Sequence, residues 1–169
     1  MNDADANLAE SETPSEPYAH TQRGWIHVLM EIIAIFLLIA IWFLPNDRFM
    51  EQLVMFIVGG ILVLVSLTFR TLTIQDQGSH LLVCFGPWRL FRRRIAFEQI
   101  SSAEAGQTAL IDGLGYHWIP FRGWTLNIAG RDCVTLQMLN GSTIRLGTDD
   151  VPGLLAAIQA KIIQHPRDL

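Results

Sequence analysis

The side chains that could form a catalytic site are scattered through the second half of the chain. A serine, a histidine and an aspartate can act together as a nucleophilic triad. The candidates are Ser101, Ser102, His80, His117, Asp112 and Asp132. No nucleophile-elbow motif supports such a triad, and the adjacent Asp149 and Asp150 are explained by capping of a helix. We therefore expect that the protein is not an enzyme.

His27 and Glu31 are the polar residues of the first long apolar run. Their i,i+4 spacing places them on one face of a helix, and ionisable groups inside a bilayer are candidates for function because they are costly there. Since Trp25 precedes them, anchoring at the membrane interface is the simplest interpretation, with Glu31 neutral or paired to His27. Two alternatives stay open: a polar contact with another membrane subunit, and ligation of a haem or pigment by His27. We expect no cofactor and no metal.

One basic cluster lies close in sequence to the apolar runs. It consists of Arg89, Arg92, Arg93 and Arg94, interleaved with Trp88 and Phe91. Each basic residue near an anionic membrane contributes about 1 kcal/mol of attraction. On a strand, however, Arg93 faces opposite to Arg92 and Arg94. The cluster therefore predicts either a lipid-binding surface or a solvated edge strand that its charge protects from mispairing.

Aromatic residues follow the glycine-rich loop at Gly113-Leu114-Gly115. The loop lacks the following helix that a phosphate cradle needs, so we expect a flexible connection. The aromatic candidates for partner binding are Tyr116, Trp118, Phe121 and Trp124. They predict an exposed rim for a protein or membrane partner, with core packing as the competing interpretation.

Two apolar runs determine where all these residues lie. The runs, Ile26 to Leu44 and Leu53 to Phe69, each match the hydrocarbon core of a bilayer, which is about 30 Å thick. The short turn between them makes the helices antiparallel neighbours, and Gly59 and Gly60 would let the two backbones approach closely. We predict a transmembrane hairpin over residues 25–69.

The flanking charges indicate the orientation of this hairpin. Arg23 and Arg70 lie outside the two runs and Arg48 lies in the turn, so the positive-inside rule places both termini in the cytoplasm. Residues 1–24 are acidic and nearly devoid of apolar side chains, and we expect disorder there. They lack the basic start of a signal peptide. We expect a multi-pass protein of the bacterial inner membrane.

Residues 70–169 have the size of one small domain. From residue 71 onward, nine Lys/Arg nearly balance eight Asp/Glu, which argues against nucleic-acid binding. Cys84 and Cys133 lack metal-ligand spacing, and we expect free, buried thiols. Alternating patterns predict about seven short antiparallel strands, forming an open barrel or sandwich closed by a C-terminal amphipathic helix. The fold class is therefore α+β. The eight candidate segments for these strands are 71–75, 80–85, 89–95, 97–105, 117–120, 125–128, 133–139 and 142–147.

The order of several short motifs resembles bacterial pleckstrin-homology-like (PH-like) domains attached to two membrane helices. The most specific motifs are Arg122-Gly123-Trp124 and Gly147-Thr148-Asp149-Asp150. The resemblance covers about residues 25 to 165 and implies the fold and the placement at a membrane. Some proteins of this outline assist the assembly of photosynthetic complexes. Eukaryotic relatives bind phosphoinositides through basic residues in the first strand-turn-strand, but the turn at 76–79 has none.

Three functions are therefore under consideration. The leading one is a non-enzymatic accessory subunit or assembly factor whose domain binds a partner in a membrane complex. The second is a module that senses anionic lipid through the arginine-rich strand. The third is a pigment- or haem-binding membrane subunit that uses His27.

Overall fold

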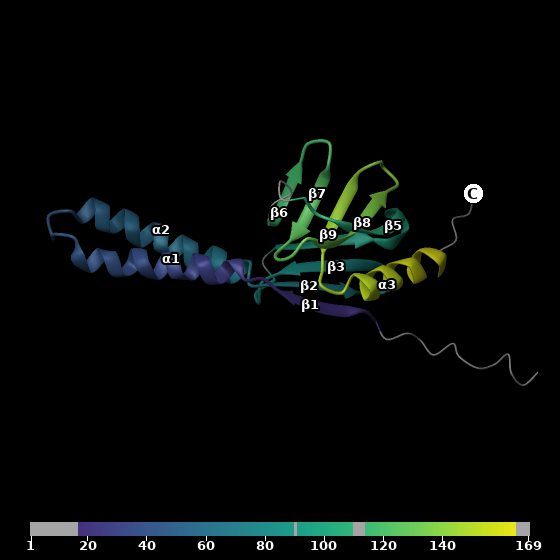
Figure 1. The fold of residues 1–169 in the computed structure, drawn as a ribbon, viewed down its shortest axis with the longest axis horizontal. Helices are drawn as coiled ribbons and strands as arrows, with labels where there is room; N and C mark the ends of the chain where they lie inside the picture. The colour runs from purple at the N-terminus through teal and green to yellow at the C-terminus, as the bar shows by residue number, and fades with distance from the viewer. Residues whose placement is uncertain (1–16, 90, 110–113, 165–169) are drawn as a thin grey trace, which may run out of the picture.

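A helical hairpin projects from a domain built of two β-sheets and one further helix (Figure 1). The structure is a computed structural model, and it describes residues 17–89, 91–109 and 114–164. The predicted α+β class is confirmed.

The hairpin consists of α1 (Ile26–Ala40), a 3-10 turn η1 (Ile41–Phe43) and α2 (Phe49–Thr68). The segments Ile26–Phe43 and Phe49–Thr68 are long and apolar enough to cross a membrane, and only 6% and 11% of them is buried. A core helix of a soluble protein buries far more of its apolar surface. The hairpin therefore leaves nearly all of its apolar side chains open to its surroundings.

One glycine brings the two helices together. A Cβ atom added to Gly59 would lie 3.0 Å from Leu38 Cδ2, whereas one added to Gly60 would meet nothing within 4 Å. The predicted close approach is confirmed at Gly59 and is wrong for Gly60, which points away from α1.

The hairpin is inserted between two paired strands. The strand β1 (Ala19–Arg23) ends just before α1, and β2 (Thr71–Asp76) begins just after α2. The two strands pair antiparallel, with Arg23 opposite Thr71. The expectation of disorder is therefore wrong for Ala19–Arg23, while residues 1–16 lie outside the described residues. The strand is held because Gln22 is buried and its side-chain amide donates to Ala129 O at 3.0 Å.

Two sheets make up the domain. The first has the order β1-β2-β3-β4, with β3 at His80–Phe85 and β4 at Phe91–Ala96. A 3-10 turn, η2 (Phe97–Gln99), leads into the second sheet, whose order is β5-β8-β9-β7-β6. Its strands are β5 (Ile100–Gln107), β6 (Gly115–Ile119), β7 (Gly123–Asn127), β8 (Asp132–Met138) and β9 (Thr143–Gly147). The predicted strand at 97–105 thus begins with a 3-10 turn.

The two sheets share one hydrophobic core but do not close into a barrel. The fully buried core residues come from both sheets, for example Leu81 and Val83 from the first and Leu126 and Leu146 from the second. The expectation of antiparallel pairing throughout is wrong at β7 and β9, which pair in parallel. From β7 the chain continues into β8, which is not a neighbour of β7 in the sheet. The hairpin turn through Gly141 then places β9 between β8 and β7.

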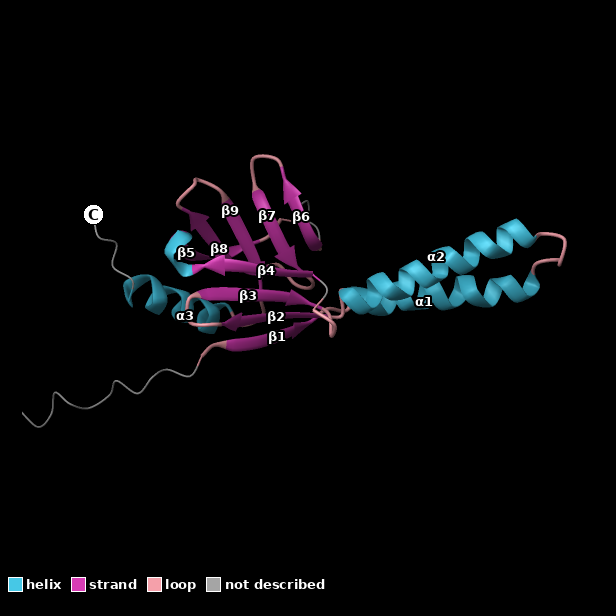
Figure 2. Cartoon of the chain, turned by 180° about the vertical axis from the view of Figure 1, so that it is seen from behind, coloured by secondary structure: helices cyan, strands magenta, loops and turns pink. Residues whose placement is uncertain are grey.

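The helix α3 (Val151–Gln164) closes the end of the domain remote from the hairpin (Figures 1 and 2). The carboxylate of Asp150 accepts a hydrogen bond from Gly153 N at 3.0 Å, which is the expected N-terminal cap. Leu154 and Ile158 are fully buried against the sheets. The predicted amphipathic helix is therefore confirmed.

Candidate functional site

The domain is joined tightly to the hairpin at one end. Gly24 N donates a hydrogen bond to Arg70 O at 3.1 Å, so the segment that enters the hairpin is hydrogen-bonded to the segment that leaves it. A Cβ atom on Gly86, in the turn after β3, would lie 2.9 Å from Thr68 O at the end of α2. The turn between β3 and β4 therefore rests on the last turn of α2.

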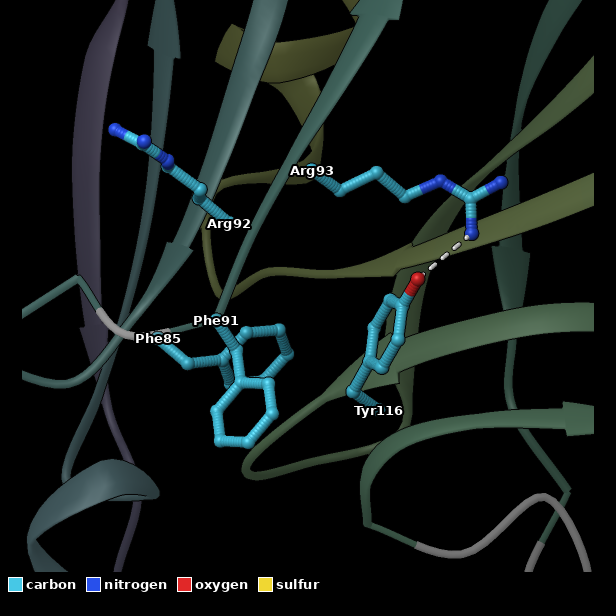
Figure 3. Close-up of a pocket in the computed structure, with 5 residues that line it drawn as sticks. All are labelled: Phe85, Phe91, Arg92, Arg93 and Tyr116. Carbon is cyan, nitrogen blue, oxygen red and sulfur yellow. Dashed lines mark hydrogen bonds between the residues drawn. The ribbon is translucent and has the colours of Figure 1, made fainter.

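The arginines of β4 alternate between the two faces of the first sheet. Arg93 lies on the core-facing row with the buried Ile95, while Arg92 and Arg94 lie exposed on the outer face. Figure 3 shows Arg92 and Arg93 extending in different directions from the strand. The predicted separation of Arg93 from Arg92 and Arg94 is confirmed. Arg89 lies in the preceding turn with a positive φ of 50°, so the four arginines do not form one surface.

Arg93 fills an open corner between the sheets. Its guanidinium lies 4.9 Å from the ring centroid of Trp124, and its Nη1 donates to the Tyr116 hydroxyl at 3.4 Å (Figure 3). The rings of Tyr116 and Trp124 stack with centroids 5.1 Å apart. Such a cation–π contact contributes about 0.5–1 kcal/mol at an exposed site. Arg93 thus covers the core where β4, the last strand of its sheet, faces β6.

A cleft of about 150 Å³ opens beside this corner. It lies between the first sheet and β6, and it is both aromatic and basic (Figure 3). Its lining residues are Phe85, Phe91, Arg92, Arg93 and Tyr116.

The second sheet extends beyond the first at β6 and β7 (Figures 1 and 2). Trp118 is paired with Trp124, and directly opposed residues of an antiparallel pair point to the same face. Tyr116 is two residues from Trp118 and shares this face. We call the face formed by Tyr116, Trp118 and Trp124 the overhang. Trp124 is partly buried against the core, whereas Trp118 is 56% exposed.

Phe121 stands at the tip of the turn between β6 and β7. Its side chain is fully exposed, and its φ of 63° lies in the left-handed region that non-glycine residues avoid. The turn is fixed by Arg122 N, which donates to Ile119 O at 3.1 Å, and by the Arg145 guanidinium, which donates to Arg122 O. The four predicted partner-binding residues therefore divide: Tyr116 and Trp124 pack on each other, while Trp118 and Phe121 are exposed.

Within the hairpin, Glu31 has a partner on the other helix. The Ser66 hydroxyl donates to Glu31 Oε1 at 2.9 Å, and Ser66 is fully buried. His27 Nδ1 is buried and has no hydrogen-bond partner in the part of the chain that the structure describes. The polar face thus ties the two helices to each other. A subunit contact and tetrapyrrole ligation by His27 stay predictions.

The residues that could have formed a triad lie on separate strands. His80 opens β3 and contacts Ser79, and the carboxylate of Asp132 on β8 accepts a hydrogen bond from the Gln107 amide at 3.1 Å. Ser101 and Ser102 lie on β5, His117 lies on β6, and Asp112 is outside the described residues. Among the described residues there is no group of three or more His, Cys, Asp or Glu that could hold a metal ion.

The two cysteines are free and buried, as predicted. Burial raises the pKa of the Cys84 thiol, and the nearby guanidinium groups of Arg89 and Arg92 counteract this only in part. A thiol with a raised pKa holds little reactive thiolate at neutral pH. Cys84 therefore behaves as a core residue.

At the remote end of the domain, β1 is tied to the start of α3. The Tyr18 hydroxyl donates to Asp150 Oδ2 at 3.2 Å, and His20 Nε2 lies 2.5 Å from Asp149 Oδ1. Sequence reasoning missed this contact because it treated both histidine and tyrosine as parts of a disordered leader. Comparison with known proteins adds no relative: no protein-family model and no curated protein matches the chain.

Proposed function

We propose that this protein is a non-enzymatic accessory subunit or assembly factor of a bacterial inner-membrane complex, and that its domain binds a protein partner through the overhang and Phe121. The domain is PH-like in this proposal. Its arrangement of two sheets around one core, with a helix over one end, supports that assignment.

The placement in the membrane is supported by the exposure of the hairpin. Apolar helices that bury 6% and 11% of their length need another apolar environment, and a bilayer supplies it. Because β1 and β2 are paired, the N-terminal strand and the domain lie on the same side of that bilayer. Arg23 and Arg70 at this end, against Arg48 in the turn, favour the cytoplasmic side. The protein is then multi-pass, with the domain and both termini in the cytoplasm.

Phe121 is the observation that carries the partner-binding proposal. Holding a non-glycine residue in the left-handed region costs on the order of 1–3 kcal/mol, and such strain is concentrated at functional sites. Here that strained position holds a large apolar ring fully in solvent, where it contributes nothing to folding. Binding to an apolar pocket of a partner would recover the burial of that ring.

The overhang supplies the rest of the surface. Trp118 and Tyr116 lie on the face that is core-facing elsewhere in the sheet, but the first sheet does not reach far enough to cover Trp118. Tryptophan and tyrosine are the residues that most often dominate binding energy at interfaces. A partner that packs on the overhang would complete the layer that the first sheet leaves open.

The test is co-purification from native membranes with the full chain in mild detergent. Phe121→Gly should reduce the recovered partner at least tenfold while leaving the fold intact, because glycine accepts the left-handed φ without strain. Ile163→Ala is the control, since Ile163 is 76% exposed on α3, away from the overhang. Recovery of the same partner by Phe121→Gly and the parent would refute the proposed surface. Membrane placement is tested separately, by retention in the membrane fraction after alkaline extraction.

A further inference from the structure

An apolar groove of about 200 Å³ lies where the hairpin meets the domain. One wall is made by Ile26 and Met30 of α1 together with Val65 and Phe69 at the end of α2, and the other is made by Gly115 and Ile128 of the domain. The groove is thus built jointly from the base of the hairpin and the second sheet. Gly115 is close to Phe69, since a Cβ atom added to it would lie 3.4 Å from Phe69 Cε1.

A row of aromatic rings separates this groove from the basic cleft beside Arg93. Phe69 and Phe85 meet edge-to-face with centroids 5.9 Å apart, and Phe85 meets Tyr116 in the same way at 6.2 Å. Phe69 lines the apolar groove, while Phe85 and Tyr116 line the basic cleft. The apolar groove at the ends of the two helices therefore adjoins the basic cleft, which lies on the other side of these aromatic rings.

The stretch that runs from the second membrane helix to the end of β4 carries charge of almost one sign. From Gln52 to Phe97 the chain carries five arginines and a single acid, Asp76. Asp76 lies at the far end of β2 and is paired with Lys161 at 3.4 Å. Arg70 and Arg89 flank the junction, and the guanidinium of Arg93 faces the cleft, where it donates to the Tyr116 hydroxyl. Two acids of the described part of the domain, Asp149 and Asp150, lie at the remote end, where they contact His20 and Tyr18.

We propose that this junction binds one anionic phospholipid, with part of an acyl chain in the apolar groove and the phosphate group beside Arg93 at the basic cleft. A phospholipid is the one abundant molecule at the base of a membrane hairpin that is apolar at one end and anionic at the other. Guanidinium groups bind phosphate oxygens strongly. The inference rests on the membrane placement proposed above; the site shares Tyr116 with the overhang, but lipid binding requires no protein partner.

The chain offers matched variants for both halves of the site. Arg93→Gln removes the guanidinium that faces the cleft, and Arg94→Gln is its control, because Arg94 is the next arginine of β4 and is exposed on the opposite face of the strand. Val65→Phe fills the groove, and Val54→Phe is its control, because Val54 is 59% exposed elsewhere on α2. Met30→Phe fills the groove from α1 and replaces Val65→Phe if that variant does not fold.

The experiment is native mass spectrometry of the full chain in detergent, titrated with phosphatidylglycerol or with phosphatidylcholine of the same acyl chains. One bound phosphatidylglycerol is expected, with a clear preference over phosphatidylcholine. Arg93→Gln should weaken phosphatidylglycerol binding about fivefold, the equivalent of about 1 kcal/mol for one basic residue, and Arg94→Gln should not. The groove-filling variant should weaken both lipids relative to Val54→Phe. Equal binding of the two lipids would overturn the proposal, and so would equal lipid binding by the two variants of either matched pair. Release of the protein from membranes by alkaline extraction would instead refute the membrane placement.

Discussion

The contact between the hairpin and the domain can be measured with two glycine substitutions. Gly86 has a φ of 69° and Gly78 has a φ of 83°, so both are in the left-handed region and both lie in tight turns of the first sheet. Their surroundings differ. A Cβ atom on Gly78 would meet nothing within 4 Å, while one on Gly86 would lie 2.9 Å from Thr68 O and 3.0 Å from Leu67 O, which are backbone atoms of α2.

The expected losses of stability follow from this difference. Gly78→Ala should lower the free energy of unfolding by about 1–2 kcal/mol, the cost of the left-handed conformation in a residue with a Cβ atom. Gly86→Ala should lose that amount and roughly 1–3 kcal/mol more, the usual cost of overpacking, because backbone atoms of a helix cannot rotate away as a flexible side chain can.

The assay is denaturant unfolding of the domain in detergent, followed by tryptophan fluorescence. Gly78→Ala serves as the control for the effect of backbone conformation. The reasoning would be refuted if the two variants lost equal stability, because the turn after β3 would then not rest on the end of α2.

Three further perturbations test other contacts. Ser66→Ala removes the donor to Glu31 Oε1 and should lower the free energy of unfolding of the hairpin by about 0.6–2 kcal/mol. Unfolding in a denaturing detergent measures this loss, and an unchanged midpoint would contradict a stabilising hydrogen bond between Ser66 and Glu31. Burial, reinforced by Asp150, raises the pKa of Tyr18 above its ordinary value of 10.0, so the folded protein keeps a proton that the unfolded chain releases. Stability should therefore fall as the pH rises above 10.0, and Tyr18→Phe should lessen that fall in denaturant titrations between pH 9 and pH 11. A maleimide should label Cys84 at neutral pH only after denaturation, and rapid labelling of the folded protein would show that the thiol is accessible.

Local chemistry made several elements predictable. The turn before His80 and the turn through Gly141 lie at the positions predicted from their turn-forming residues. Gly141 has the positive φ, 79°, that such a turn requires. The start of α3 was predicted because Asp150 is an N-cap residue ahead of an apolar helical repeat. Each of these signals depends on residues within a few positions of one another.

The first strand had no such signal. Its partner β2 begins after the entire hairpin, so the pairing of Arg23 with Thr71 is not local. The strand also buries a polar side chain, Gln22, whose amide nitrogen donates to the carbonyl of Ala129 in the turn between β7 and β8. A polar segment ahead of a membrane helix is typical of a disordered leader, and only the tertiary hydrogen bonds distinguish it from one.

The sequence identified the residues of the candidate site, but it did not show which of them pack against the core and which are exposed. The alternation of Tyr116 and Trp118 is a period of two, which could have shown that they share one face of a strand. Whether that face is covered depends on how far the first sheet extends toward β6, and the sequence of β6 carries no information on that point. The same holds for Arg93, which covers the core only because Trp124 lies opposite it.

The insertion of the hairpin between paired strands has a mechanical consequence for both proposed surfaces. A domain attached by a single flexible linker would sample many orientations relative to a bilayer. Here the chain has no free linker, since Gly24 and Arg70 are hydrogen-bonded to each other and β1 pairs with β2 immediately beyond them. The height of the overhang and of the basic cleft above the helix ends is therefore set by the sheet itself. A partner that binds the overhang while embedded in the same membrane meets a surface already held at the correct level, and so loses less orientational entropy on binding than it would with a tethered domain.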